Sequence, residues 1–120
     1  MLNTEEKTLA VVAALEDVKA SNIKVIDTSK QSTMFERMVI ASAQSTRQTR
    51  ALADNVVVKL KERGEKIYGR EGDDSGEWIL VDLGEVLVHI MQPAVRDYYN
   101  LEELWNKVQT TRPRLAKAPR

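Results

Sequence analysis

The residue best suited to acid–base chemistry in this 120-residue chain is its only histidine, His89. Nucleophilic hydrolysis would need a serine on a strained G-x-S-x-G turn near such a base, and the chain lacks that motif. His89 lies instead in a predicted strand, so we interpret it as a structural or interface residue. The chain has no cysteine, which excludes disulfides, thiolate metal sites and cysteine catalysis.

Three carboxylates in one short polar segment, Glu71, Asp73 and Asp74, have the oxygen chemistry that a hard cation prefers. Their spacing lacks the twelve-residue pattern of a calcium-binding loop, so we interpret them as solvated loop acids. The chain also lacks the glycine-rich motifs G-x-x-x-x-G-K-S/T and G-x-G-x-x-G, and Lys30 lies in an ordinary polar turn. The sequence therefore predicts no enzyme, no cofactor and no metal site.

Charge is balanced overall, with 18 basic and 18 acidic residues, but it is unevenly distributed. Residues 1–70 have a net charge of +3, residues 71–103 of −8 and residues 104–120 of +5. The overall balance argues against nucleic-acid binding as the main function, because such domains usually carry a basic excess. The acidic block is either a solvated face or a surface that attracts a basic partner, and charge alone leaves both open.

Apolar spacing, capping residues and turn residues predict the elements that position these side chains. The chain has the length of one domain and no apolar run of the ~20 residues that a membrane span needs. Its N-terminus lacks the features of a secretory or transit signal, which favours a cytoplasmic protein. We expect helices over 4–20, 46–63, 93–99 and 101–108, and strands over 23–28, 38–41, 66–68, 78–83 and 86–91.

This order, α-β-β-α-β-β-β-α-α, is typical of a small single-domain α/β protein with a mixed five-stranded sheet and flanking helices. Residues 78–83 and 86–91 should pair as an antiparallel hairpin around Gly84. Side chains alternate along a strand, so one face should be aliphatic core, with Ile79, Val81, Val86, Val88 and Ile90. The other face should carry Trp78, Leu80, Asp82, Glu85, Leu87, His89 and Met91.

The second face mixes large apolar groups with carboxylates, as a binding surface with an aromatic anchor does. The alternative is that helices cover this face and that the acids lie at the end of the hairpin. A shift of one residue in the pairing would exchange the two faces.

The hairpin segment also contains a long motif, W-x-x-x-D-x-G-D/E-x-x-x-H-x-M/F, which runs from Trp78 to Met91. Related positions follow at Arg96, Tyr99, Leu101, Leu104 and Trp105, and precede it at Asp27, Thr28, Ser32, residues 43–48, Ala53 and Asp54. With these residues the sequence resembles the ribosomal silencing factor family, which is also called Iojap-related. The resemblance covers roughly residues 4–106.

The resemblance implies a fold similar to nucleotidyltransferases but without their activity. It implies a translational repressor that binds the large ribosomal subunit through its protein fourteen. The bound factor would sterically block joining of the small subunit and lower translation when nutrients are limited. A large-subunit assembly factor is the alternative, and a nucleotidyltransferase-like enzyme is a further one.

The resemblance and the acidic block together suggest a partner-binding set of Trp78, Asp82, Leu83, Glu85, Met91, Arg96 and Tyr99. Strict alternation places Leu83 on the core face, and Arg96 has the alternative of bracing Asp97 or Glu102. We expect a domain over residues 1–108 and a disordered basic tail over 109–120. The tail is a candidate for a minor ribosomal RNA contact. We expect no membrane partner, and the sequence leaves open whether the chain is a monomer or a homodimer.

Overall fold

The structure, a computed structural model, describes residues 2–105 of the chain. Its elements are α1 (Thr4–Asp17), β1 (Ser21–Asp27), β2 (Arg37–Ser42), α2 (Thr46–Glu62), β3 (Gly69–Glu71), β4 (Trp78–Asp82), β5 (Val86–Met91) and α3 (Pro93–Tyr99). A further helical segment covers residues 101–105, so the predicted order of elements is confirmed. The predicted domain end at residue 108 and the predicted tail, 109–120, lie outside the described residues.

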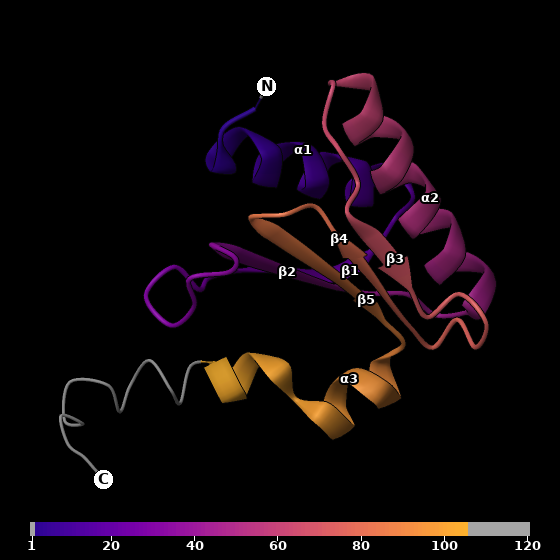
Figure 1. Cartoon of the computed structure of the whole chain (residues 1–120). Coiled ribbons are helices and arrows are strands. Elements are labelled where there is room, and N and C mark those ends of the chain that lie inside the picture. Colours follow the sequence, from indigo (N-terminus) through magenta and orange to yellow (C-terminus); the bar gives the residue numbers. More distant parts are fainter. Residues whose placement is uncertain (1, 106–120) are drawn as a thin grey trace, which may run out of the picture.

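The elements form three layers, with α1 and α2 on one face of the sheet and α3 on the other (Figure 1). The strand order is β1-β2-β5-β4-β3. The central strands β2 and β5 are parallel, whereas each of the other neighbouring pairs is antiparallel. This arrangement confirms the predicted small α/β domain with a mixed five-stranded sheet. The similarity to nucleotidyltransferases stays a prediction.

Helix ends follow the local capping chemistry. Asn3 and Glu6 form a capping box at the start of α1: the Asn3 side chain accepts the Glu6 amide at 2.8 Å, and the Glu6 side chain accepts the Asn3 amide at 3.0 Å. Ser45 caps α2, where its side chain accepts the amide of Gln48. Helix α1 ends at Asp17, before the expected residue 20, because Lys19 adopts a left-handed φ of 62°.

The main core lies between the sheet and the two helices α1 and α2. Both helices and the inner face of the hairpin contribute aliphatic side chains with no exposed surface. They include Val11, Leu15, Leu52, Val56, Leu60, Ile79, Val81, Val86, Val88 and Ile90. The predicted aliphatic face of the hairpin is therefore confirmed as core.

The predicted third strand is misplaced. The sequence predicts a strand over residues 66–68, but β3 covers Gly69–Glu71 and pairs with β4 at the edge of the sheet. Its central residue, Arg70, is held by ion pairs to Asp54 on α2 and Asp73 in the following loop, at 2.8 and 2.7 Å. Polar side chains fit an edge strand, so apolar spacing does not mark its position.

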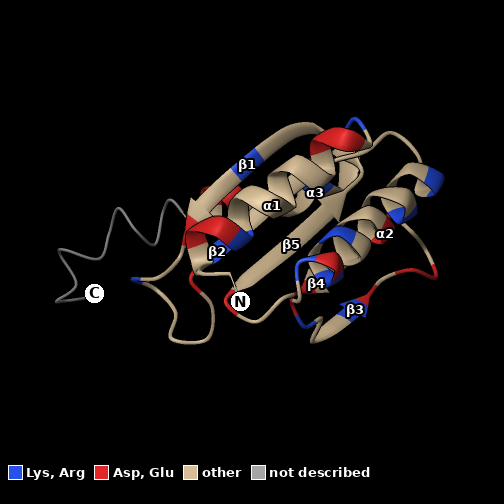
Figure 2. Cartoon of the chain, turned by 90° about the horizontal axis from the view of Figure 1, so that it is seen from above, with Lys and Arg blue, Asp and Glu red and all other residues tan. Residues whose placement is uncertain are grey.

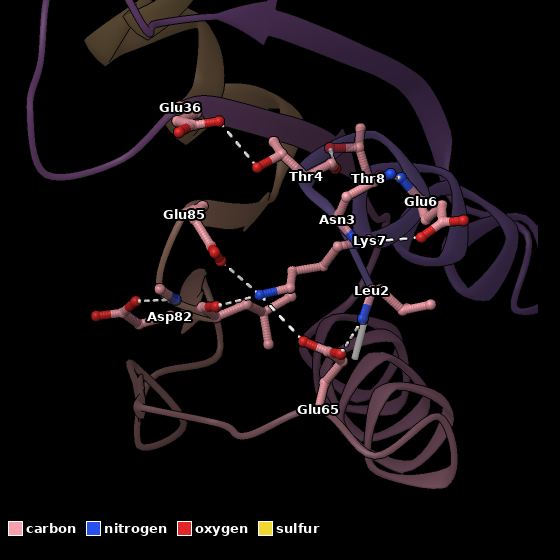
Figure 3. Close-up of polar contacts among 12 residues, drawn as sticks. Leu2, Asn3, Thr4, Glu6, Lys7, Thr8, Glu36, Glu65, Asp82 and Glu85 are labelled. Atoms are coloured by element: carbon pink, nitrogen blue, oxygen red, sulfur yellow. Dashed lines mark hydrogen bonds and ion pairs between the residues drawn. The ribbon is translucent and has the colours of Figure 1, made fainter.

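Lys7, on α1, is a buried cation that joins three parts of the fold (Figure 3). Its side chain is 6% exposed, and its Nζ lies 3.1 Å from Glu65 Oε1 and 2.5 Å from Glu85 Oε1. Lys7 also donates to the Leu83 carbonyl in the β4–β5 turn, at 3.1 Å. Glu65 follows α2 and accepts the amide of Leu2 at 2.8 Å. This network holds the start of α1 against the end of α2 and against the hairpin turn.

The charges of the network depend on one another. Burial disfavours the charged form of Lys7, but hydrogen bonds to Glu85 and Glu65 outweigh it and raise the pKa of Lys7. The Leu2 amide, with help from Lys7, lowers the pKa of Glu65 against the effect of burial. The hydrogen bond from Lys7 is also the main reason that the pKa of Glu85 is lowered. All three groups are therefore charged at neutral pH.

We expect Lys7→Met to lower the free energy of unfolding by about 3 kcal/mol, because it leaves the buried Glu65 carboxylate without its cation. Chemical denaturation followed by circular dichroism measures this loss. Combining Lys7→Met with Glu65→Gln should recover much of it, because no uncompensated buried charge remains. Equal stability of Lys7→Met and the original chain would show that the network does not support the fold.

Candidate protein-binding surface

The outer face of the β4–β5 hairpin carries the mixed side chains that alternation predicts for it. Its cross-strand pairs are Trp78 with Met91, Leu80 with His89, and Asp82 with Leu87. On the same face, Glu71 of β3 lies opposite Leu80. The register therefore places apolar groups, carboxylates and the histidine side by side.

Helical segments after β5 cover one half of this face. Met91 is buried there with Ile26, Met38 and Ile40, against partly buried side chains that include Phe35, Val95, Leu101 and Trp105. The other half stays accessible. We define the open face as the partly or largely exposed residues Trp78, Leu80, Asp82, Leu87 and Tyr99.

Trp78 is the aromatic centre of the open face. Its ring centroid lies 5.0 Å from that of Tyr99 and 5.8 Å from that of His89. Its indole Nε1 donates a hydrogen bond of 2.9 Å to His89 Nδ1. Tyr99 is itself 54% exposed and packs edge-on against Tyr98. Trp78 is thus partly exposed yet held on two sides, which limits the conformational entropy it loses on binding.

His89 is neutral and has one unsatisfied ring nitrogen. Only 8% of the residue is exposed, and burial lowers its pKa to about 4. Because Nδ1 accepts the proton of Trp78, the neutral ring carries its own proton on Nε2. That Nε2 is buried and has no hydrogen-bond partner among the described residues. The burial of His89 and its bond to Trp78 are compatible with the structural or interface interpretation drawn from the sequence.

A small open pocket adjoins this histidine. It has a volume of about 250 Å³ and is lined by Glu71, Gly72, Trp78, Leu80 and His89. Gly72 forms one side of the pocket and has a left-handed φ of 101°. A Cβ at this position would lie 2.0 Å from the Trp78 carbonyl oxygen. Backbone therefore forms part of the wall, and only glycine fits at this point.

Much of the acidic block carries unpaired charge. Of its nine acidic residues, Asp73, Glu85 and Glu102 form ion pairs. The other six form none with residues 2–105, namely Glu71, Asp74, Glu77, Asp82, Asp97 and Glu103. Lys and Arg residues instead occur along α2, on the other side of the sheet (Figure 2).

Two predicted contact residues are placed in the interior. Met91 has no exposed surface, because α3 and the segment 101–105 cover its half of the face. Leu83 also has none, because it packs in the main core, where strict alternation puts it. The prediction that these two residues contact a partner is therefore wrong for this fold, because their side chains are buried. Both residues instead support the surface from below. Glu85 is exposed, but its carboxylate is already paired with Lys7.

Arg96 is largely buried and braces the fold. It is 8% exposed, and its Nη1 donates to the Asn22 carbonyl at 2.7 Å and to Ser42 Oγ at 2.8 Å. Its Nη2 pairs with Glu102 Oε2 at 2.7 Å, which is one of the two bracing partners expected from the sequence. Arg96 thereby joins α3 to β1, β2 and the segment 101–105.

Three residues of the accessible surface were absent from the predicted contact set: Leu80, Leu87 and Glu71. Alternation signals the two leucines, because both lie on the outer face of the hairpin. Glu71 has no such signal, since its place opposite Leu80 depends on the true register of β3.

None of the helices in residues 2–105 has the length and apolar character for crossing a membrane, and these residues contain no cluster of metal-binding side chains.

Comparisons with known proteins agree with the signature on the hairpin. The family model described as ribosomal silencing factor during starvation matches residues 2–120. A ribosomal silencing factor from Chromobacterium violaceum is 52% identical over 104 residues, which cover 87% of this chain and 85% of that protein. A crystal structure of a protein from the same species superimposes with a TM-score of 0.86 at 51% identity and covers 88% of each chain.

A mouse protein named mitochondrial assembly of ribosomal large subunit protein 1 is 34% identical over 98 residues, which cover 79% of this chain and 43% of that protein. The bacterial names describe a regulatory factor of the ribosome and not an enzyme. The family match extends across the fold and the open face, and it includes the Trp78-to-Met91 signature. The chain therefore belongs to the ribosomal silencing factor family.

Proposed function

We propose that this protein represses translation by binding the large ribosomal subunit through its open face. The partner on the subunit is ribosomal protein fourteen, and the bound protein sterically prevents the small subunit from joining. Translation is thereby lowered when nutrients are limited. Membership of the ribosomal silencing factor family supports the ribosome-associated regulatory role in general.

The observation that carries this proposal is the partly exposed Trp78, held in place by His89 and Tyr99, on a face with unpaired carboxylates. Aromatic side chains in firm positions are the commonest anchors of protein interfaces. Glu71 lines a pocket with this anchor, and Asp82 lies at the other end of β4 on the same sheet face. Neither carboxylate forms an ion pair with residues 2–105. Such a surface complements a basic protein, and its charge speeds the encounter.

An assembly role is the second candidate, favoured by the mouse relative named for assembly of the large subunit. Both functions use the same surface and the same partner. They differ in the particle that is bound: a repressor occupies finished large subunits, whereas an assembly factor occupies precursors. Depleting the protein and profiling large-subunit precursors separates the two.

We expect the purified chain to sediment with isolated large subunits and to be excluded from joined ribosomes, because its site would be closed in the joined particle. Sucrose-gradient centrifugation followed by immunoblotting measures both. Added in excess, the chain should also reduce the joining of free subunits. Equal recovery in the two fractions would rule out the steric mechanism.

Trp78→Ala should weaken binding to large subunits about thirtyfold, since loss of an interface anchor typically costs about 2 kcal/mol. Equilibrium binding of labelled protein to subunits measures the change. Val58→Ala, at a 49% exposed valine on α2, removes apolar surface from the opposite side and serves as the matched control. Thermal unfolding checks that both variants are folded. The same affinity for both variants would show that the open face is not the binding surface.

Removing rim charge should slow association more than it speeds dissociation. Asp82→Asn combined with Glu71→Gln is the variant of choice, because both carboxylates lie on the sheet face that carries Trp78. An amide oxygen at position 82 still accepts the Gly84 amide, now bonded at 2.9 Å. Stopped-flow or biolayer kinetics should show slower association and a weaker dependence on salt. Glu16→Gln combined with Asp17→Asn removes the same charge from α1 as control. Equal slowing by both pairs would point to net charge and not to this surface.

A further inference from the structure

The pocket beside His89 is lined by a residue with an unpaired hydrogen-bonding atom, which the proposed binding of the large subunit does not yet use. His89 lines the pocket, and only 8% of the residue is exposed. Its Nε2 has no hydrogen-bond partner among residues 2–105. Buried donors in folded proteins are almost always hydrogen-bonded. A donor left unpaired at the edge of a binding surface is therefore a group that a ligand can satisfy.

The hydrogen bond from Trp78 decides which ring nitrogen is available. Nδ1 accepts the indole proton at 2.9 Å, so it is the unprotonated nitrogen, and Nε2–H is the donor. The same bond fixes the rotation of the imidazole ring relative to Trp78. Leu80, the partly buried cross-strand neighbour of His89, lines the same pocket. Nε2 is itself buried, so a ligand group reaches this donor of fixed direction only when a side chain of the pocket wall moves aside.

The pocket walls restrict the kind of acceptor. Trp78 and Leu80 supply apolar surface, and Gly72 supplies backbone. Glu71, at the rim, is exposed and forms no ion pair with another described residue. Its negative charge disfavours a carboxylate or phosphate as the acceptor and favours a cation next to it. A volume of about 250 Å³ suits a few heavy atoms, and not a nucleotide.

We propose that this pocket binds a main-chain carbonyl from a basic loop of the protein partner, which accepts the His89 Nε2–H while a neighbouring Lys or Arg pairs with Glu71. His89 is then a specificity-determining contact residue, because it recognises backbone held in one position instead of charge alone. This inference rests on the proposed binding of the large subunit through the open face and names a further contact within it.

The test separates the two functions of the imidazole. In His89→Asn the side-chain oxygen takes the place of Nδ1 and accepts from Trp78, but no donor reaches the position of Nε2. In His89→Gln the amide nitrogen reaches that position and restores a donor. We expect His89→Asn to bind large subunits about tenfold more weakly than the original chain, and His89→Gln to lose markedly less. The indole N–H of Trp78 should stay hydrogen-bonded in His89→Asn, as slow exchange of its proton with solvent would show, which excludes a merely structural cause.

Several results would overturn the proposal. Equal affinity of His89→Asn and the original chain would show that only water meets the donor. A proton on Nδ1, seen by ¹⁵N NMR of the imidazole ring in the free chain, would remove the donor altogether. Equal weakening by His89→Asn toward protein-free ribosomal RNA would assign the acceptor to nucleic acid. If the original chain does not bind large subunits at all, the proposed function itself is wrong. If it binds and His89→Asn binds equally well, only the proposed pocket contact is wrong.

Discussion

The antiparallel pairing of β4 with β5 decides which side chains this protein buries and which it exposes. Val81 lies opposite Val88, and a shift of one residue would turn the aliphatic face toward solvent. The turn maintains this register, because Gly84 adopts a φ of 92° and donates its amide to Asp82. Lys7 adds a long-range restraint by bonding the Leu83 carbonyl from α1. The buried cation thus supports the geometry of a surface on the other side of the sheet.

The sequence predicts most of the fold because most of its elements carry their own local signals. The capping residues Asn3 and Ser45 mark the starts of α1 and α2, and strict alternation marks the two hairpin strands. The exceptions lack such a signal. Residues 69–71 extend because β4 offers them a partner and because carboxylates hold Arg70, and neither condition is visible in the local pattern.

The same distinction applies to the surface. Alternation tells which side of the sheet a residue takes, and it assigns Trp78, Asp82 and Met91 correctly to the outer side. It does not tell which part of that side is covered. Met91 is hidden because Arg96 and Glu102 bring the chain after β5 back across the sheet, and this depends on contacts between distant residues. The hydrogen bond between Trp78 and His89 likewise follows from packing and not from spacing.

The place of β5 in the sheet has a consequence for biosynthesis. This strand lies between β2 and β4, so Val39 finds its neighbour Val88 only after most of the domain has been translated. A nascent chain that ends before β5 contains α1, the β1–β2 pair, α2 and the β3–β4 pair, but the inner edge of β2 is still unpaired and the two pairs of strands are not yet joined into one sheet. Non-local pairing of this kind slows folding and exposes strand edges in the meantime. The central pairing of the sheet therefore has to wait until β5 has been synthesised, even though β2 is made early.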